Sequence, residues 1–191
     1  MNTFRIHLRP ILGWVTVIAL LTFPVLSVSG ALNMFLKIAT VDGESTTKGY
    51  EKQIDVLAWS WGMSNSGTTH SGSGTTAGKA NVQDFSFTKN LDRASPALML
   101  AALTGTTYAD ATLTVLRPIP NKAGATYDYL KLKLENVLVT SVSGGGTPTQ
   151  DKLTENVTLN FSKFTLEYKP ADSSGYVGSS IPVTYDILGA Q

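Results

Sequence analysis

The chain of 191 residues is 42% hydrophobic and 15% charged, a composition typical of one folded globular domain with or without a short appendage. It contains no cysteine, which excludes disulfide bonds and thiolate metal sites. The net charge is +1 and becomes −1 without the first thirty residues, which hold two arginines and no acid. We therefore expect no nucleic-acid partner, because nucleic-acid binding needs a clustered basic face.

Residues 1–30 have the pattern of a secretory signal peptide. Basic side chains precede an apolar run over 11–23, and small residues then lead to a cleavage position before or just after Ala31. Export through this leader predicts a secreted, extracellular protein whose residues 31–191 form one domain.

Two alternatives to cleaved export remain open. The run from 11 to 28 approaches the length of a thin membrane span, so the leader can be an uncleaved anchor and the only part of the chain in contact with a membrane. Met34 can instead be the true start, which predicts a cytoplasmic protein.

Strand patterns begin at residue 33. Residues 33–41 alternate apolar side chains between two faces, and a turn and a polar surface loop then extend to Lys52. Residues 54–63 place Leu57, Trp59, Trp61 and Met63 on one face and Ile54, Val56, Ala58, Ser60 and Gly62 on the other. We expect the bulky face to fill the core rather than to form a sugar-binding platform, and the small face to meet a close neighbour or solvent.

Residues 64–78 are rich in glycine, serine and threonine and hold no apolar side chain larger than Ala77. Such a segment cannot bury enough surface to fold by itself, and it is longer than the loop of about two to five residues that a hairpin needs. We expect a disordered tip or a surface that contacts another molecule. A strand over 82–88, with Phe85 and Phe87 on one face, follows it.

One short helix is predicted over 95–104. Ser95 suits the N-cap, Pro96 suits the first helical position, and Gly105 supplies the stop. The apolar residues between them leave no polar face, so we expect this helix to be buried on nearly all sides or covered by a partner.

The rest of the chain reads as strands. Residues 111–115, 127–142 and 153–168 alternate apolar and polar side chains, and the last two runs change parity, which indicates β-bulges that bend them. A short strand over 181–188 ends the chain. The fold class is therefore mainly β, a compact barrel or sandwich of two sheets with one flanking helix.

Candidate catalytic groups are few. His70, the only histidine after the leader, lies in the glycine-rich loop, where we expect a solvated or interface role. Asp84, Glu135 and Glu155 lie on strands, where acids on a polar face are usually just solvated. The sequence thus predicts no enzyme, no cofactor and no metal site.

Several ordered blocks carry a family resemblance: residues 34–38, 43–45, 54–63, 78–89, 95–99, 153–161 and 182–185. Together they resemble the haemolysin-coregulated protein (Hcp) family, the tube subunits of bacterial type VI secretion systems. The blocks recur in order, which makes the resemblance stronger than that of one short motif.

The resemblance implies a barrel that assembles with itself into a hexameric ring, and rings that stack into a hollow tube able to carry small protein effectors. The family's extended loop reaches the neighbouring ring, which here assigns stacking to Ser64, Asn65, Gly67, His70, Gly72, Gly74 and Gly78. From parity alone, we infer that Val56, Ala58 and Ser60 line the lumen.

The predicted leader departs from the family, whose tube subunits normally lack a signal peptide. An exported copy cannot enter a cytoplasmic sheath. The alternative function is therefore a secreted binding or fibre-forming protein that keeps the fold. A hydrolase is the least favoured reading, because catalytic groups are scarce.

Overall fold

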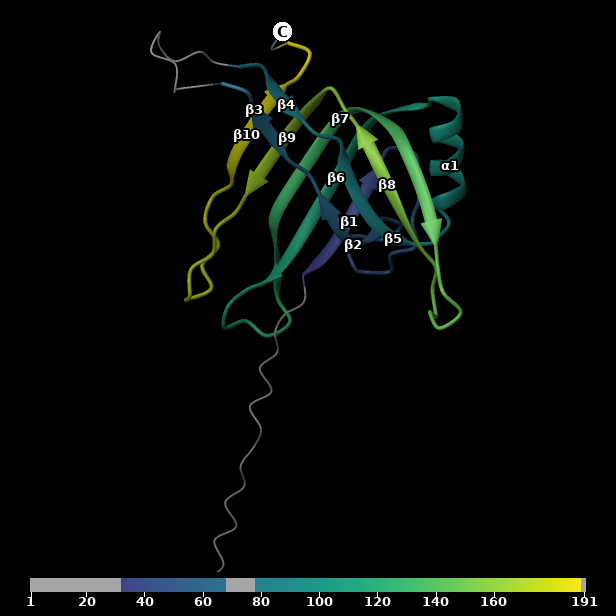
Figure 1. The fold of residues 1–191 in the computed structure, drawn as a ribbon. Helices are drawn as coiled ribbons and strands as arrows, with labels where there is room; N and C mark the ends of the chain where they lie inside the picture. Colours follow the sequence, from purple (N-terminus) through teal and green to yellow (C-terminus); the bar gives the residue numbers. More distant parts are fainter. Residues whose placement is uncertain (1–31, 68–77, 190–191) are drawn as a thin grey trace, which may run out of the picture.

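Six antiparallel strands close into a barrel in the computed structural model, which describes residues 32–67 and 78–189 (Figure 1). The order around the barrel is β7 (Thr126–Gly145), β6 (Thr107–Pro118), β1 (Asn33–Ile38), β2 (Ile54–Ser60), β5 (Phe85–Asn90) and β8 (Thr154–Asn160). Strand β8 then pairs with β7, which closes the ring of hydrogen bonds. A closed barrel leaves no free strand edge within it.

Strand β7 organises the barrel because its 20 residues serve two neighbours along one edge. Its second half pairs with β8, and its first half pairs with β9 (Lys163–Tyr168). The register with β8 shifts between Val139 and Ser141, so the bulge predicted in this run is present. The second predicted bulge is instead a break at residues 161 and 162, where β8 gives way to β9.

Two further pieces extend from the barrel on the same side of the molecule. Strand β10 (Ile181–Asp186) pairs with β9 and ends the sheet. Strands β3 (Met63–Asn65) and β4 (Ala80–Val82) form a separate two-stranded ribbon, which we call the arm. Figure 1 shows the arm and β10 on the side of the barrel opposite to α1.

The core fills the barrel with aliphatic and phenylalanine side chains from each of the six barrel strands. Its fully buried members include Leu36, Ile54, Phe85, Phe87, Leu113, Leu132, Leu134, Val157 and Leu159. Alternate residues of each strand point inward, which is why the period-two patterns predicted the strands correctly.

The parity prediction for β2 is wrong in its first half, where Ile54 and Val56 rather than Leu57 point into the core. The register of β2 against β5 shifts between Val56 and Ala58, so the inward face changes there. Val56 is buried while Leu57 is 48% exposed. Trp59 packs inward after the shift and stacks on Phe85, with 6.0 Å between ring centroids.

Helix α1 (Ser95–Thr104) flanks the barrel and ends at Gly105, whose φ of 69° provides the predicted left-handed stop. The predicted N-cap is wrong by one residue: Ala94 holds the N-cap position and makes no side-chain cap bond. Only Ser95, Leu98 and Ala101 of the helix are fully buried. Of the two predicted alternatives, burial of the helix on nearly all sides is wrong, because its apolar outer face is exposed in the single chain. Cover by a partner stays a prediction.

The leader predicted over residues 1–30 lies outside the described residues. Within the two stretches that are described, no helix is both long and apolar enough to cross a membrane. The division of the chain at residue 31 stays a prediction.

Candidate functional site

The arm projects from the barrel on the same side as β10 (Figure 1). Met63 pairs with Val82 and Asn65 with Ala80, so the first part of the predicted loop is a paired strand. The Asn65 side chain donates to the carbonyl of Gly78 at 2.9 Å and accepts from the N–H of Gly67 at 2.8 Å. These bonds tie together the two chain segments that leave the arm.

Trp61 anchors the arm to the barrel. Its Nε1 donates to the carbonyl of Gln83 at 3.0 Å, and the Gln83 N–H donates to the carbonyl of Gly62 at 2.9 Å. The indole lies edge-on to Phe164, with 4.7 Å between ring centroids. Sequence parity predicted a core tryptophan; it did not predict that the ring joins the arm to β9.

The residues predicted for ring stacking divide into two groups. Ser64 and Asn65 lie on the arm, and Gly67 and Gly78 lie at its outer end. His70, Gly72 and Gly74 lie outside the described residues. The structure therefore brings the flanks of the predicted contact segment together on one projecting ribbon.

The residues predicted for the lumen do not share one face. Val56 is only 5% exposed, because its side chain points into the barrel core. The prediction that Val56 lines the lumen is therefore wrong. Ala58 and Ser60, beyond the register shift, are exposed. A strict two-residue alternation placed all three together, and the bulge separates them.

A groove separates the arm from β10. It has a volume of about 360 Å³ and is lined by Met63, Ser64, Asn65, Ala80, Val82, Phe164, Val183, Thr184 and Tyr185. None of these side chains is charged. The Phe164 and Tyr185 rings that line it lie 6.0 Å apart between centroids, and Val183 is 53% exposed.

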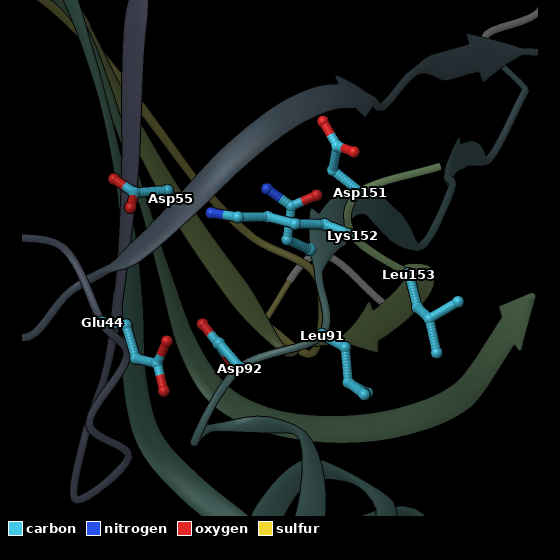
Figure 2. A pocket seen from close by; sticks show the side chains of 8 residues that line it. Glu44, Asp55, Leu91, Asp92, Asp151, Lys152 and Leu153 are labelled. Atoms are coloured by element: carbon cyan, nitrogen blue, oxygen red, sulfur yellow. The ribbon is translucent and has the colours of Figure 1, made fainter. Parts of the chain in front are cut away.

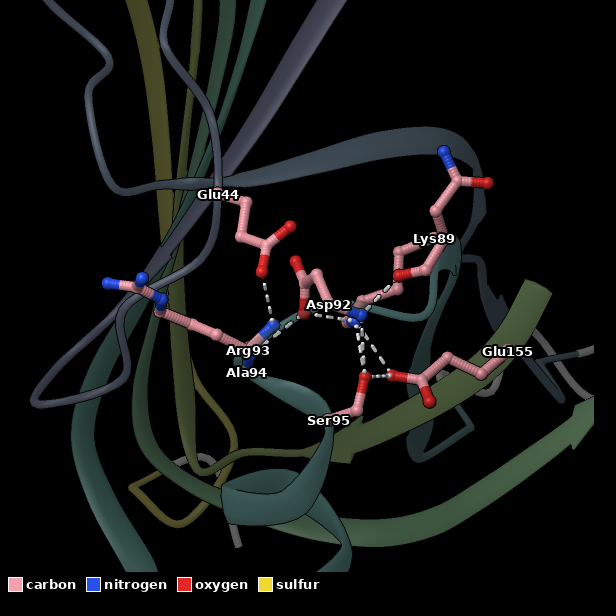
Figure 3. Close-up of polar contacts among 8 residues, drawn as sticks. Glu44, Lys89, Asp92, Arg93, Ala94, Ser95 and Glu155 are labelled. Carbon is pink, nitrogen blue, oxygen red and sulfur yellow. Dashed lines mark hydrogen bonds and ion pairs between the residues drawn. The ribbon is translucent and has the colours of Figure 1, made fainter. Parts of the chain in front are cut away.

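A buried ion cluster fastens α1 to the barrel (Figure 3). Lys89 Nζ lies 2.6 Å from Asp92 Oδ1 and 2.8 Å from Glu155 Oε1. Ser95 Oγ accepts from Lys89 Nζ at 2.9 Å and donates to Glu155 Oε1 at 2.7 Å. This use of its hydroxyl explains why Ser95 begins the helix without capping it.

The ion cluster corrects the expectation that strand acids are solvated. The side chains of Lys89 and Glu155 are fully buried. Lys89 lies on the same inward-pointing face of β5 as Phe85 and Phe87. Glu155 lies on the same inward-pointing face of β8 as Val157 and Leu159. This shared parity was the sequence signal that marked both charges as interior.

Asp84 and Glu135, the other two acids considered for catalysis, have structural partners. Asp84 accepts hydrogen bonds from Asn160 Nδ2 at 2.7 Å and from Thr140 Oγ1 at 3.1 Å. Glu135 lies 3.6 Å from Lys133 and 3.8 Å from Lys163 in a partly exposed group of charges.

An acidic pocket of about 330 Å³ lies beside the start of α1 (Figure 2). Its charged lining residues are Glu44, Asp55, Asp92, Asp151 and Lys152. Figure 2 shows the carboxylates spread around the wall rather than directed at one point. No group of three or more acids or histidines in the described stretches is arranged to hold a metal ion.

A polar contact with the first residues of β7 holds the loop before β2. Tyr50 Oη donates to Asp128 Oδ1 at 2.6 Å, and the Tyr50 ring stacks on Phe35 with 4.6 Å between centroids. Burial, together with the bond to Asp128, raises the pKa of Tyr50, which keeps its hydroxyl protonated as a donor. Burial alone would raise the pKa of Asp128, but hydrogen bonds from Lys131 and Tyr50 outweigh it and lower that pKa.

Comparisons with known proteins agree with this geometry. The sequence profile of the family described as "Type VI secretion system effector, Hcp" matches residues 35–168. The protein hcp1 of Pseudomonas aeruginosa is 50% identical over 147 residues, which cover 76% of this chain and 88% of that protein.

Solved structures show the same fold. A structure described as that of a type six secretion system protein superposes with a TM-score of 0.77 at 30% identity, covering 84% of this chain and 99% of the other. Hcp1 from Salmonella typhimurium superposes with a TM-score of 0.67 at 31% identity, covering 84% and 98%.

Proposed function

The chain belongs to the Hcp family of type VI secretion system proteins, and on that premise we propose that its copies form hexameric rings that stack into a hollow tube. Members of this family are structural tube proteins rather than enzymes.

The projecting arm carries the proposal. The strands of a closed barrel pair with one another all the way round, so the barrel does not need the arm to cover a free strand edge. The arm also leaves most of its own surface exposed, as a surface for contact with another molecule would be. The arm is nevertheless held firmly, by Trp61 on the barrel and by Asn65 between its strands. A rigid base under a glycine-rich segment suits contact with a neighbouring ring, and we assign stacking to the arm and residues 64–78.

We propose that Ala58 and Ser60 contribute to the wall of the tube lumen. Both follow the bulge of β2 and are exposed on the outside of the barrel. Their small side chains leave room for a small protein effector, the cargo that the lumen would carry.

The predicted leader favours a second candidate. If residues 1–30 direct export, the chain acts outside the cytoplasm as a secreted fibre-forming or binding protein with the same fold. N-terminal sequencing of the protein from each cell fraction separates the cases. A mature chain beginning near Ala31 in the medium of cells without a sheath supports export, and a cytoplasmic chain beginning at Met34 supports the tube.

The stacking assignment is tested by deleting residues 68–77 and joining the arm with a short Gly-Ser turn. We expect the shortened protein to fold and to form rings, seen by negative-stain microscopy, while stacked tubes are lost. Stacking at the level of the full chain would contradict the assignment, and so would unfolding of the barrel, because the segment would then be structural.

A further inference from the structure

The strand register places the start of β1 and the arm at opposite ends of the sheet. One row of register partners runs through Met34, Val115, Leu130, Tyr168 and Ile181. A second row, nearer the arm, runs through Ile38, Ala111, Leu134, Phe164 and Tyr185. The last two residues of this second row line the groove beside the arm. Figure 1 shows the start of β1 below and the arm above.

The end of the barrel beyond the first row, which we call the leader end, is formed by residues 32–33, 117–127 and 169–180. Its two loops are tied together. Asn121 Nδ2 donates to the carbonyl of Ser173 at 2.6 Å, and Gly175 lies against Pro120. The chain leaves the described structure from this end, at Leu32.

Basic side chains dominate the charge of the leader end. Its charged residues are three basic and one acidic, a net charge of +2: Arg117, Lys122, Lys169 and Asp172. The acid is engaged within its own turn, where it accepts from the N–H groups of Ser174 and Tyr176. Tyr176 itself is 69% exposed. Lysine and arginine beside an exposed tyrosine are typical of surfaces that meet anionic lipid headgroups.

The sequence before Leu32 limits the distance between this end and a bilayer. Residues 11–28 hold no charged side chain and approach the length of a thin membrane span. Only residues 29–31 separate that run from Leu32, and fully extended chain covers at most about 14 Å from residue 28 to residue 32. That distance is comparable with the Debye length of about 8 to 10 Å at ordinary salt concentrations, so the basic side chains lie within the field of the headgroups.

We propose that, in the chain that keeps its leader, the leader end of the barrel lies against the headgroups of an anionic lipid bilayer. Arg117, Lys122 and Lys169 meet the phosphate groups, and Tyr176 enters the interface. The membrane contact thus extends from the leader to the folded barrel, and the arm points away from the membrane. A ring held in this way cannot accept another ring on its leader end. On the proposed ring assembly, stacking then proceeds only from the arm side.

Two single cysteines report the contact, because the chain has none of its own. Tyr176→Cys lies on the leader end and Ser64→Cys lies on the arm, and both native side chains are exposed. The full chain is synthesised in a cell-free system without signal peptidase, with vesicles of phosphatidylcholine alone or of phosphatidylcholine mixed with phosphatidylglycerol. Each cysteine is labelled with the environment-sensitive dye NBD. We expect a blue shift of the dye at position 176 on the mixed vesicles and no shift at position 64.

Charge reversal tests the basic side chains. Arg117→Glu together with Lys122→Glu should abolish the blue shift at position 176 while the leader still anchors the protein. The matched control, Lys79→Glu together with Lys152→Glu, makes the same change in net charge at exposed lysines outside the leader end and should leave the shift unchanged. Circular dichroism verifies that each variant folds. High salt gives the same test without a substitution, because screening should reduce the shift.

Several outcomes overturn the membrane contact. No shift at position 176, or equal shifts at positions 176 and 64, shows that the leader end does not face the bilayer. Equal shifts on the two kinds of vesicle show that headgroup charge is not recognised. A shift at position 176 without vesicles means that another copy of the chain covers this end.

Negative-stain microscopy of the same samples separates this contact from the proposed tube. Rings that form without the shift at position 176 remove the membrane contact and leave the tube function standing. The shift without rings supports the membrane contact and counts against the tube function alone.

Discussion

The Nζ atom of Lys89 lies 2.8 Å from Oε1 of Glu155, and both side chains are fully excluded from solvent. The two residues are direct register partners on β5 and β8. The cluster that they form with Asp92 and Ser95 joins two barrel strands to the start of α1. An interior cluster of charged and polar groups therefore helps to hold the start of α1 against the barrel.

Replacing Lys89 by Met should destabilise the protein by about 3 to 5 kcal/mol, because removal of one partner leaves an uncompensated buried charge. Urea unfolding measures the change. The double variant Lys89→Met with Glu155→Leu should recover much of the loss, since it removes the remaining charge.

The matched control for this prediction is Lys133→Ala, which removes a partly exposed lysine 3.6 Å from Glu135. It should change the free energy of unfolding by less than about 1 kcal/mol, because exposed ion pairs contribute little. Equal effects at Lys89 and Lys133 would show that burial of the pair has no energetic consequence.

Asp128→Asn should lower stability by about 1 to 2 kcal/mol at neutral pH, because the charged acceptor of Tyr50 and Lys131 is lost. The folded-state pKa of Asp128 is lowered. Its contribution is therefore complete above the unfolded pKa of about 3.9 and is lost as the pH falls through the lower folded value. Unfolding measured from pH 7 downward should show the gap to the wild type closing only below about pH 4.

The partner variant Tyr50→Phe keeps the ring that stacks on Phe35 and removes only the hydroxyl. It should cost about 1 kcal/mol. A gap between wild type and Asp128→Asn that stays the same down to pH 3 would contradict the assigned contact.

Trp61→Ala should loosen the arm while the barrel stays folded, because the indole supplies both the bond to Gln83 and the edge contact with Phe164. We expect faster proteolytic cleavage within residues 62–82 and shorter stacks in negative-stain images. Trp61→Phe keeps most of the ring contact and should lie between Trp61→Ala and the wild type. Identical cleavage rates for all three proteins would show that the arm does not depend on this anchor.

The sequence was sufficient for the parts of the fold that depend on local pattern. Alternation predicted the strands, and Gly105 predicted the end of the helix because only a residue tolerant of positive φ suits that position. The family resemblance supplied the barrel and the tube, and the comparisons confirm both family and fold.

Features that depend on contacts between distant residues were not predictable in the same way. The bulge after Val56 arises from pairing with β5, which no local pattern in β2 reveals. The uncharged groove forms from the arm, β9 and β10, which are far apart in the chain. Lys89 and Glu155 carried a parity signal, but its meaning depends on the register that makes them partners.

Multi-angle light scattering of the purified protein across a wide concentration range tests the central claim most directly. The proposed ring assembly predicts a particle of six chains, with larger multiples of that ring as the concentration rises. A monomer at every concentration would contradict it.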